Sequence, residues 1–513
     1  MKLTCLLATC AVSLPLACPC LAQTTQSTSK PALRFTISKE TTRITGPLRP
    51  DGRPDYIAAI NAAHSKGVTK DNNAAVLYVQ AVGPTVLGKT TAAQSAALKL
   101  LGMESPKGPF ITTYADEQEV HDCASQLTRA SAHPKVAEWI KANEAPLNVL
   151  VQASKRTRWY LPAIAPDDEP IAMHVYQNMP ASLCDVVMNM LIIRAHFAIV
   201  DGRIPEALED MLALARLGNL MGQGYSLSEQ LDSAHCLDTA NVSIARCAAL
   251  DTFDRKTIKS LLDQLSVIRP NPPISYLDEW SRYMLLDSLC YASTRAPEQS
   301  VKDLEAYCRV LKVNWTLNGT PDPERASGIR EAAQQSSKAD WNVYLRKANG
   351  LSDIVIRGTQ TSNVSKRREL TSAYLKSLKD FRGRSIEHLE QLNKKDHPQF
   401  SDVFADLIIL DQSSRMLDQS VLVSEITDST AAKHDLTLIV LALMAFKADH
   451  GSTPDRLADL APAYLTSVPK DPFSGKDFIY RPNDEIHLVY SVGKNLKDDG
   501  GNPKDDIVSA VAR

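Results

Sequence analysis

Apolar residues recur at helical spacing along most of the chain. Several of these runs begin at Ser, Thr, Asp, Asn or Pro and end at Gly or Pro, which are typical start and stop signals of helices. The clearest stripe is Leu208, Met211, Leu212 and Ala215. The pattern predicts helices over residues 54–67, 72–82, 91–101, 116–131, 134–142, 145–155, 181–200, 205–220, 226–249, 254–268, 274–292 and 301–311. Residues 365–391 are highly charged, and residues 403–419 lead toward the C-terminal part of the chain.

Two of these segments form the clearest predicted hairpin. Residues 181–200 and 205–220 are joined by Asp201-Gly202-Arg203; Gly202 can adopt a positive φ in the turn, and Pro205 suits the first turn of a helix. The pair resembles a tetratricopeptide-type hairpin, but we find no recurrence at ~34 residues, so no regular solenoid is predicted. The apolar stripe lapses at Gly218-Asn219, which predicts a weakening second helix.

The last 80 residues show a different pattern. The run Leu436–Phe446 is apolar almost all round and predicts a helix buried on most faces; it is far short of the ~20 residues that a bilayer requires. Gly451 ends this helix, and Thr453-Pro454-Asp455 predicts the start of another. Residues 478–480 and 486–491 predict two strands joined around Asn483-Asp484.

These elements predict a mainly α protein, in which an irregular helical-hairpin domain precedes a small α+β module. Low aromatic content (6%) and abundant Ala and Leu favour helices over a large sheet. The expected organisation is a signal peptide over 1–22, a flexible Ser/Thr-rich lead-in over 23–49, the α-helical domain over 50–430 and the α+β module over 431–513.

The first residues predict export. Lys2 precedes an apolar stretch from Leu3 to Leu16, and small residues lead to a cleavage site near Ala22, which is the pattern of a secretory signal. The alternative is a lipoprotein signal, with lipid on Cys18. The expected location is the periplasm or the outside of the cell, with no transmembrane span in the mature chain.

Charge and cysteine content narrow the function classes. The formal net charge is −2, so no basic field exists to recruit nucleic acid, and no nucleic-acid partner is expected. Six cysteines follow the leader: Cys123, Cys184, Cys236, Cys247, Cys290 and Cys308. Disulfides are permitted in an exported chain, and burial as small apolar residues is the alternative.

A set of dispersed residues in the C-terminal module follows a recognisable order: Asp471-Pro472, Gly475, Tyr480, Tyr490-Ser491, Gly493 and Asp505-Asp506. On these residues the module resembles the corresponding part of the major pseudopilin of type II secretion systems. The resemblance covers about the last 80 residues, and the membrane helix that begins a pseudopilin does not precede them, so we expect a borrowed domain and not a polymerising pilin. The helical region, including Lys66–Thr69 and Asn72–Ala75, is similar to exported proteins of planctomycete-type bacteria, which implies a lineage and no mechanism.

The terminal loop is the candidate metal site. Oxygen-bearing side chains are concentrated there, and Gly500-Gly501 permits the sharp folding that would bring them together. Ca²⁺ takes six to eight oxygen ligands, so this composition suits it; a solvated polar turn is the alternative. The candidate ligands are Asn495, Asp498, Asp499, Asp505 and Asp506. The resemblance to pseudopilins implies Asn495, Asp505 and Asp506 among these, with backbone oxygens near Val492.

No recognised catalytic motif is present. Histidine and cysteine occur close together in His121-Asp122-Cys123 and in His235-Cys236. Both pairs lie in predicted helices, where side chains this close in sequence diverge and do not readily share a metal. We therefore expect an exported, non-enzymatic scaffold or interaction protein with a protein or cell-envelope partner and a calcium-stabilised module. The alternatives are an envelope hydrolase, whose site is assembled in the helical domain from residues distant in sequence, and an accessory protein of a secretion apparatus.

Overall fold

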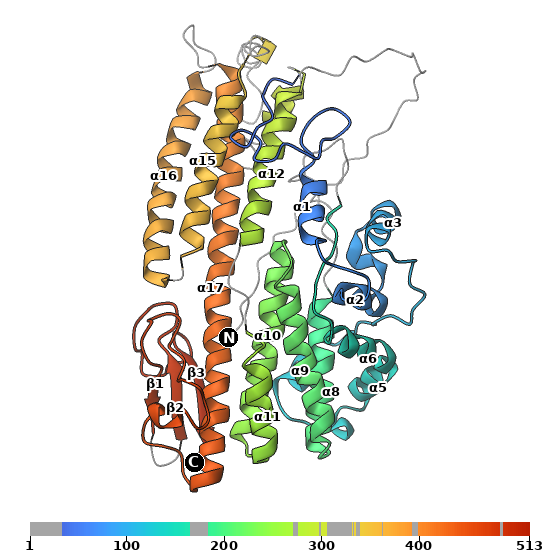
Figure 1. The fold of residues 1–513 in the computed structure, drawn as a ribbon, viewed down its shortest axis with the longest axis vertical. Helices are drawn as coiled ribbons and strands as arrows, with labels where there is room; N and C mark the ends of the chain where they lie inside the picture. The colour runs from blue at the N-terminus through green and yellow to red at the C-terminus, as the bar shows by residue number, and fades with distance from the viewer. Residues whose placement is uncertain are drawn as a thin grey trace. The chain divides into compact units, whose positions relative to one another are not determined.

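The computed structural model is mainly helical, with one small antiparallel sheet near the C-terminal end (Figure 1). It describes residues 33–164, 183–269, 275–296, 299–304, 331, 333–334, 339–361, 363–391, 399–482 and 486–512. Residues 33–513 form one compact unit. The predicted signal peptide, Cys18 and Cys308 lie outside the described residues.

The first part of the chain folds into short helices whose starts are fixed by side-chain caps. The carboxylates of Asp55 and Asp116, the amide oxygen of Asn73 and the hydroxyl of Thr90 each accept a backbone N–H in the first turn that follows. The predicted helix positions are confirmed, with bounds of α1 Tyr56–His64, α2 Ala74–Val82, α3 Thr91–Leu100, α4 Glu117–Ser125, α5 Pro134–Ala142 and α6 Glu144–Ala153.

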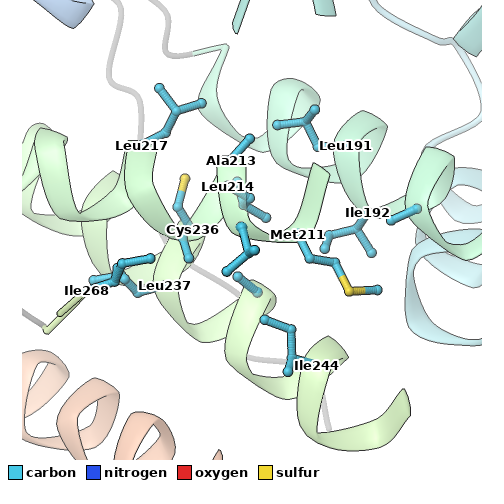
Figure 2. Close-up of a cluster of buried hydrophobic side chains, with 14 of the residues drawn as sticks. Leu191, Ile192, Met211, Ala213, Leu214, Leu217, Cys236, Leu237, Ile244 and Ile268 are labelled. Carbon is cyan, nitrogen blue, oxygen red and sulfur yellow. The ribbon is translucent and has the colours of Figure 1, made fainter. Parts of the chain in front are cut away.

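The predicted hairpin is confirmed as α8 (Cys184–Val200) and α9 (Ile204–Met221), with Gly202 at φ +76° in the turn. The expected weakening at Gly218 is wrong, because α9 continues to Met221. A Cβ at Gly218 would lie 2.9 Å from both the carbonyl oxygen of Ser233 and the Cβ of Cys236 on α10 (Leu227–Ala249). The glycine therefore allows two helices to approach closely. Figure 2 shows buried side chains of α8, α9 and α10, among them Leu217 and Cys236.

A single helix, α17 (Phe400–His450), runs through two hydrophobic cores. Its first half packs with α12 (Ser275–Ser293), α15 (Asn342–Thr359) and α16 (Val364–Gln391), whereas the apolar run at 436–445 packs with α10 and α11 (Arg255–Leu265) (Figure 1). Leu436–Ala445 are all buried, as predicted. The helix is far longer than that run, and it crosses residue 431 without interruption. It is also the one described helix long and apolar enough to cross a bilayer, and 72% of its most apolar window is buried in the protein.

The sheet of the C-terminal module has the order β1-β2-β3 and packs on α17. The two predicted strands are confirmed as β1 (Ile479–Arg481) and β2 (Ile486–Ser491), paired antiparallel with Ile479 opposite Tyr490. A third strand, β3 (Ile507–Ala512), was not predicted; it pairs antiparallel with β2, and its β-branched residues are the signal for it. The helix expected from Thr453 is wrong, since only a short 3₁₀ turn forms at Leu457–Leu460.

Residues 33–49, within the expected lead-in, contain no helix but are tied to the rest of the unit. Phe35, Thr41 and Thr42 are buried, and the hydroxyl of Tyr56 donates to the carbonyl of Thr42 at 2.9 Å. The amide of Asn349 on α15 donates to the carbonyl of Thr41 at 2.8 Å. This segment therefore joins α1 to the core around α12 and α15.

Candidate functional site

The Asp471-Pro472 and Tyr490-Ser491 motifs of the C-terminal module meet at a buried hydrogen bond. Asp471 is 1% exposed, and its Oδ1 accepts the Ser491 hydroxyl at 2.7 Å and the backbone N–H of Phe473 at 3.0 Å. Its Oδ2 accepts the hydroxyl of Ser474 at 2.8 Å. The carboxylate thus ties the turn after Lys470 to the end of β2, from which the acidic loop leaves.

The acidic loop, residues 493–506, begins with a close backbone approach. Gly493 has a φ of +60°, and a Cβ there would lie 2.2 Å from the carbonyl oxygen of Asp505. Only glycine satisfies both conditions. The start and end of the loop are therefore held side by side, and the carbonyl oxygen of Asp505 lies at their junction.

Asp506 is the buried acid of the loop. Its side chain is 4% exposed, and Oδ2 accepts the backbone N–H of Gly501 at 2.8 Å. Within the described part of the chain, no hydrogen-bond donor reaches its other oxygen, Oδ1. A buried carboxylate oxygen without a partner is costly, so a cation or a water is the expected complement.

The other four predicted ligands are exposed, and the structure does not gather them around Asp506. Asp498 accepts the Arg481 guanidinium at 3.0 Å and the Tyr490 hydroxyl at 2.9 Å. The hydrogen bond from the Gly500 backbone N–H, followed by that from Tyr490, lowers the pKa of Asp498.

Asn495 and Asp499 form a separate contact, in which the amide donates to the carboxylate at 2.6 Å. Asp505 and Asp506 are neighbours, but only Asp506 is buried. Among the described residues, no three His, Cys, Asp or Glu side chains are grouped as a metal site would require. A metal in this loop would therefore depend on Asp506, on backbone carbonyls and on few other side chains.

The loop also contacts the helical body. The guanidinium of Arg368, near the start of α16, donates to the backbone carbonyl of Lys494. The neighbouring Arg367 pairs with Asp428 on α17. The conformation of the loop is thus linked to the position of α16 against α17.

A second cluster, which the sequence did not reveal, lies between α8 and α10. The Nε2 atom of His196 lies 2.7 Å from the Ser243 hydroxyl oxygen, and its Nδ1 atom lies 3.3 Å from the carbonyl oxygen of Cys123. A carbonyl can only accept, so Nδ1 carries the proton and Nε2 of the neutral ring accepts from Ser243. Burial lowers the pKa of His196, which favours this neutral form.

Ser243 also lines a cavity of about 220 Å³. Its other lining residues are Ala124, Ser125, Ile192, Asp238, Thr239, Val242 and Arg246. His196 and Ser243 lie in predicted helices 47 positions apart, in no recognisable motif, so only the packing of α8 on α10 brings them together.

The two His–Cys neighbours in the sequence diverge as predicted. Cys123 and Cys236 are buried, whereas His121 and His235 are exposed on the other sides of their helices. Comparison of the chain with protein-family models, with curated proteins and with solved structures finds no match.

Proposed function

We propose that the protein is an exported, non-enzymatic scaffold that serves a protein or cell-envelope partner, and that Ca²⁺ stabilises its C-terminal module. The observation that supports calcium is the buried Asp506 carboxylate, with one oxygen unpartnered among the described residues. Asp506 and backbone oxygens of the loop would hold the ion. The predicted leader supports export, and the continuous α17 supports a scaffold.

Calcium would fix a structural element and catalyse nothing. A divalent ion at Asp506 would neutralise a buried charge and hold the ends of the loop together. Because Arg368 contacts the same loop, α16 would be steadied as well. A scaffold that keeps one geometry for its partner gains from such an ion.

Thermal unfolding of the full-length chain in EGTA and then in excess Ca²⁺ tests this proposal. We expect the wild type to melt higher with calcium, since a ligand that binds only the folded state stabilises it. Asp506→Asn should lose the calcium shift. Asp477→Asn, a change at an exposed residue of the same module, should keep it.

The variant Asp498→Asn tests whether Asp498 binds the calcium ion or only stabilises the loop. Its carboxylate is already bonded to Arg481 and Tyr490, so the variant should melt lower while retaining the calcium shift. Identical wild-type curves in EGTA and in calcium would refute the calcium proposal. Loss of the shift in Asp498→Asn, with its retention in Asp506→Asn, would place the ion elsewhere in the loop.

One observation favours a second function, that of a serine hydrolase. Ser243 is hydrogen-bonded to a neutral histidine whose other nitrogen is oriented by a carbonyl, which is the arrangement that activates a serine nucleophile. The cavity beside it would admit the reacting group of a substrate. A fluorophosphonate probe should label the wild type but not Ser243→Ala or His196→Ala. Labelling at Ser243 would overturn the non-enzymatic proposal, and its absence would refute the hydrolase.

A further inference from the structure

Two cysteines that are distant in sequence lie in sulfur contact. Cys184 is the first residue of α8, and Cys236 lies within α10, 52 positions later. Their sulfur atoms are 3.4 Å apart, and both side chains are 1% exposed. Because they are enclosed together, each is the natural reaction partner of the other.

We propose that Cys184 and Cys236 form a structural disulfide when the protein folds in an oxidising environment. A disulfide requires sulfur atoms about 2.05 Å apart, so the contact must close by somewhat more than 1 Å. Cys184 is the first residue of α8, and helix ends fray more readily than helix interiors, so this end can supply the movement. The cross-link would join the start of α8 to the middle of α10 and would enclose α9 in the closed loop.

The oxidation requires an external disulfide, such as oxidised glutathione or a disulfide oxidoreductase. One thiolate attacks a sulfur of that acceptor and forms a mixed disulfide while releasing the acceptor's first thiolate. The second cysteine thiolate then attacks the protein sulfur and releases the remaining thiolate. The two cysteines together lose two protons and two electrons, and the acceptor is reduced to two thiols.

Burial sets the timing of the reaction. The hydrogen bond with Cys236 and burial raise the pKa of the Cys184 thiol, so little reactive thiolate exists in the folded protein. The bond should therefore form during folding, before α8 and α10 enclose the sulfurs. Folded, fully reduced protein should oxidise slowly.

Mass spectrometry of the full-length chain, refolded with oxidised and reduced glutathione, tests the inference. Digestion without reductant should yield one peptide pair joined through Cys184 and Cys236, and reductant should split it. Cys247→Ala, which removes another buried cysteine of α10, should leave the pair intact. The wild-type result requires no variant to fold.

Thermal unfolding provides a second measurement. Reductant should lower the melting temperature of the cross-linked protein by several degrees, because the bond restricts the unfolded chain. A chain with both cysteines replaced by Ala should melt at the same temperature with and without reductant. Free thiols at both positions after oxidative refolding, or a main cross-link to a different cysteine, would overturn the inference.

Discussion

Removal of the Asp471 carboxylate should loosen the C-terminal module selectively. Asp471→Ala eliminates an acceptor that serves the Ser491 hydroxyl, the Ser474 hydroxyl and the Phe473 backbone N–H. Phe473 is buried, so its N–H would be left without a partner. The hydroxyl of Ser491 also accepts the Gly493 backbone N–H at 3.1 Å, so the change reaches the start of the acidic loop.

The expected magnitude follows from these contacts. Hydrogen bonds to charged groups contribute about 1.5–3 kcal/mol each, and a buried donor left unpaired costs about 1–3 kcal/mol. The buried carboxylate itself is costly to desolvate, and its removal offsets part of this loss. We therefore expect Asp471→Ala to lower the free energy of unfolding of the module by about 3 kcal/mol. Asp471→Asn keeps an acceptor for Ser491 and should cost about 1 kcal/mol.

Hydrogen exchange followed by mass spectrometry resolves this local effect. Peptides that contain β2 should exchange roughly 100-fold faster in Asp471→Ala, because about 1.4 kcal/mol corresponds to a tenfold change in an equilibrium constant. Peptides from α8 and α9 should be unchanged. Asp477→Ala is the matched control, since that residue forms an exposed ion pair with Lys470 and should have little effect. If β2 exchanges equally slowly in the two alanine variants, the assigned role of Asp471 is wrong.

Two further changes test the packing of the helical body. Burial raises the pKa of Asp278 from 3.8 to about 7, so the folded protein binds more protons than the unfolded chain between these pH values, and its stability falls as pH rises through this window. The variant Asp278→Asn lacks this titration, so thermal melts should show it gaining stability relative to the wild type from pH 4 to pH 8. Parallel curves of melting temperature against pH would contradict this. Gly218→Ala should lower the free energy of unfolding, measured by urea titration, by about 1–3 kcal/mol, because the added Cβ would clash with the Ser233 carbonyl on α10. This clash should outweigh the higher helix propensity of Ala. An unchanged urea midpoint would show that the two helices can separate at little cost.

The positions of the short helices α1 to α6 and of the α8–α9 hairpin could be predicted from the sequence, because helix formation is specified locally. The cap residues Asp55, Asn73 and Asp116 act on the turn that follows them, and Gly202 sets its own turn. The burial of residues 436–445 could be predicted for the same reason, because consecutive apolar residues place apolar side chains on every face of the helix.

The candidate site was only partly predictable. The acidic loop stood out by composition, but composition does not show which way a carboxylate points. Arg481 and Tyr490 on the sheet hold Asp498, whereas the approach of Gly493 to Asp505 accompanies the burial of Asp506. The exposed and buried acids are neighbours in sequence and differ only in what folds over them.

Only the tertiary structure decided which distant residues meet. Three contacts join residues of different helices: His196 with Ser243, Cys184 with Cys236, and Gly218 with the backbone of α10. No local sequence motif indicates that these partners would meet. The sequence determined where the local helix signals lie, because those depend on neighbours along the chain. The pairing of helix faces depends on how side chains of several helices fill a shared core, and that information is distributed over the whole chain.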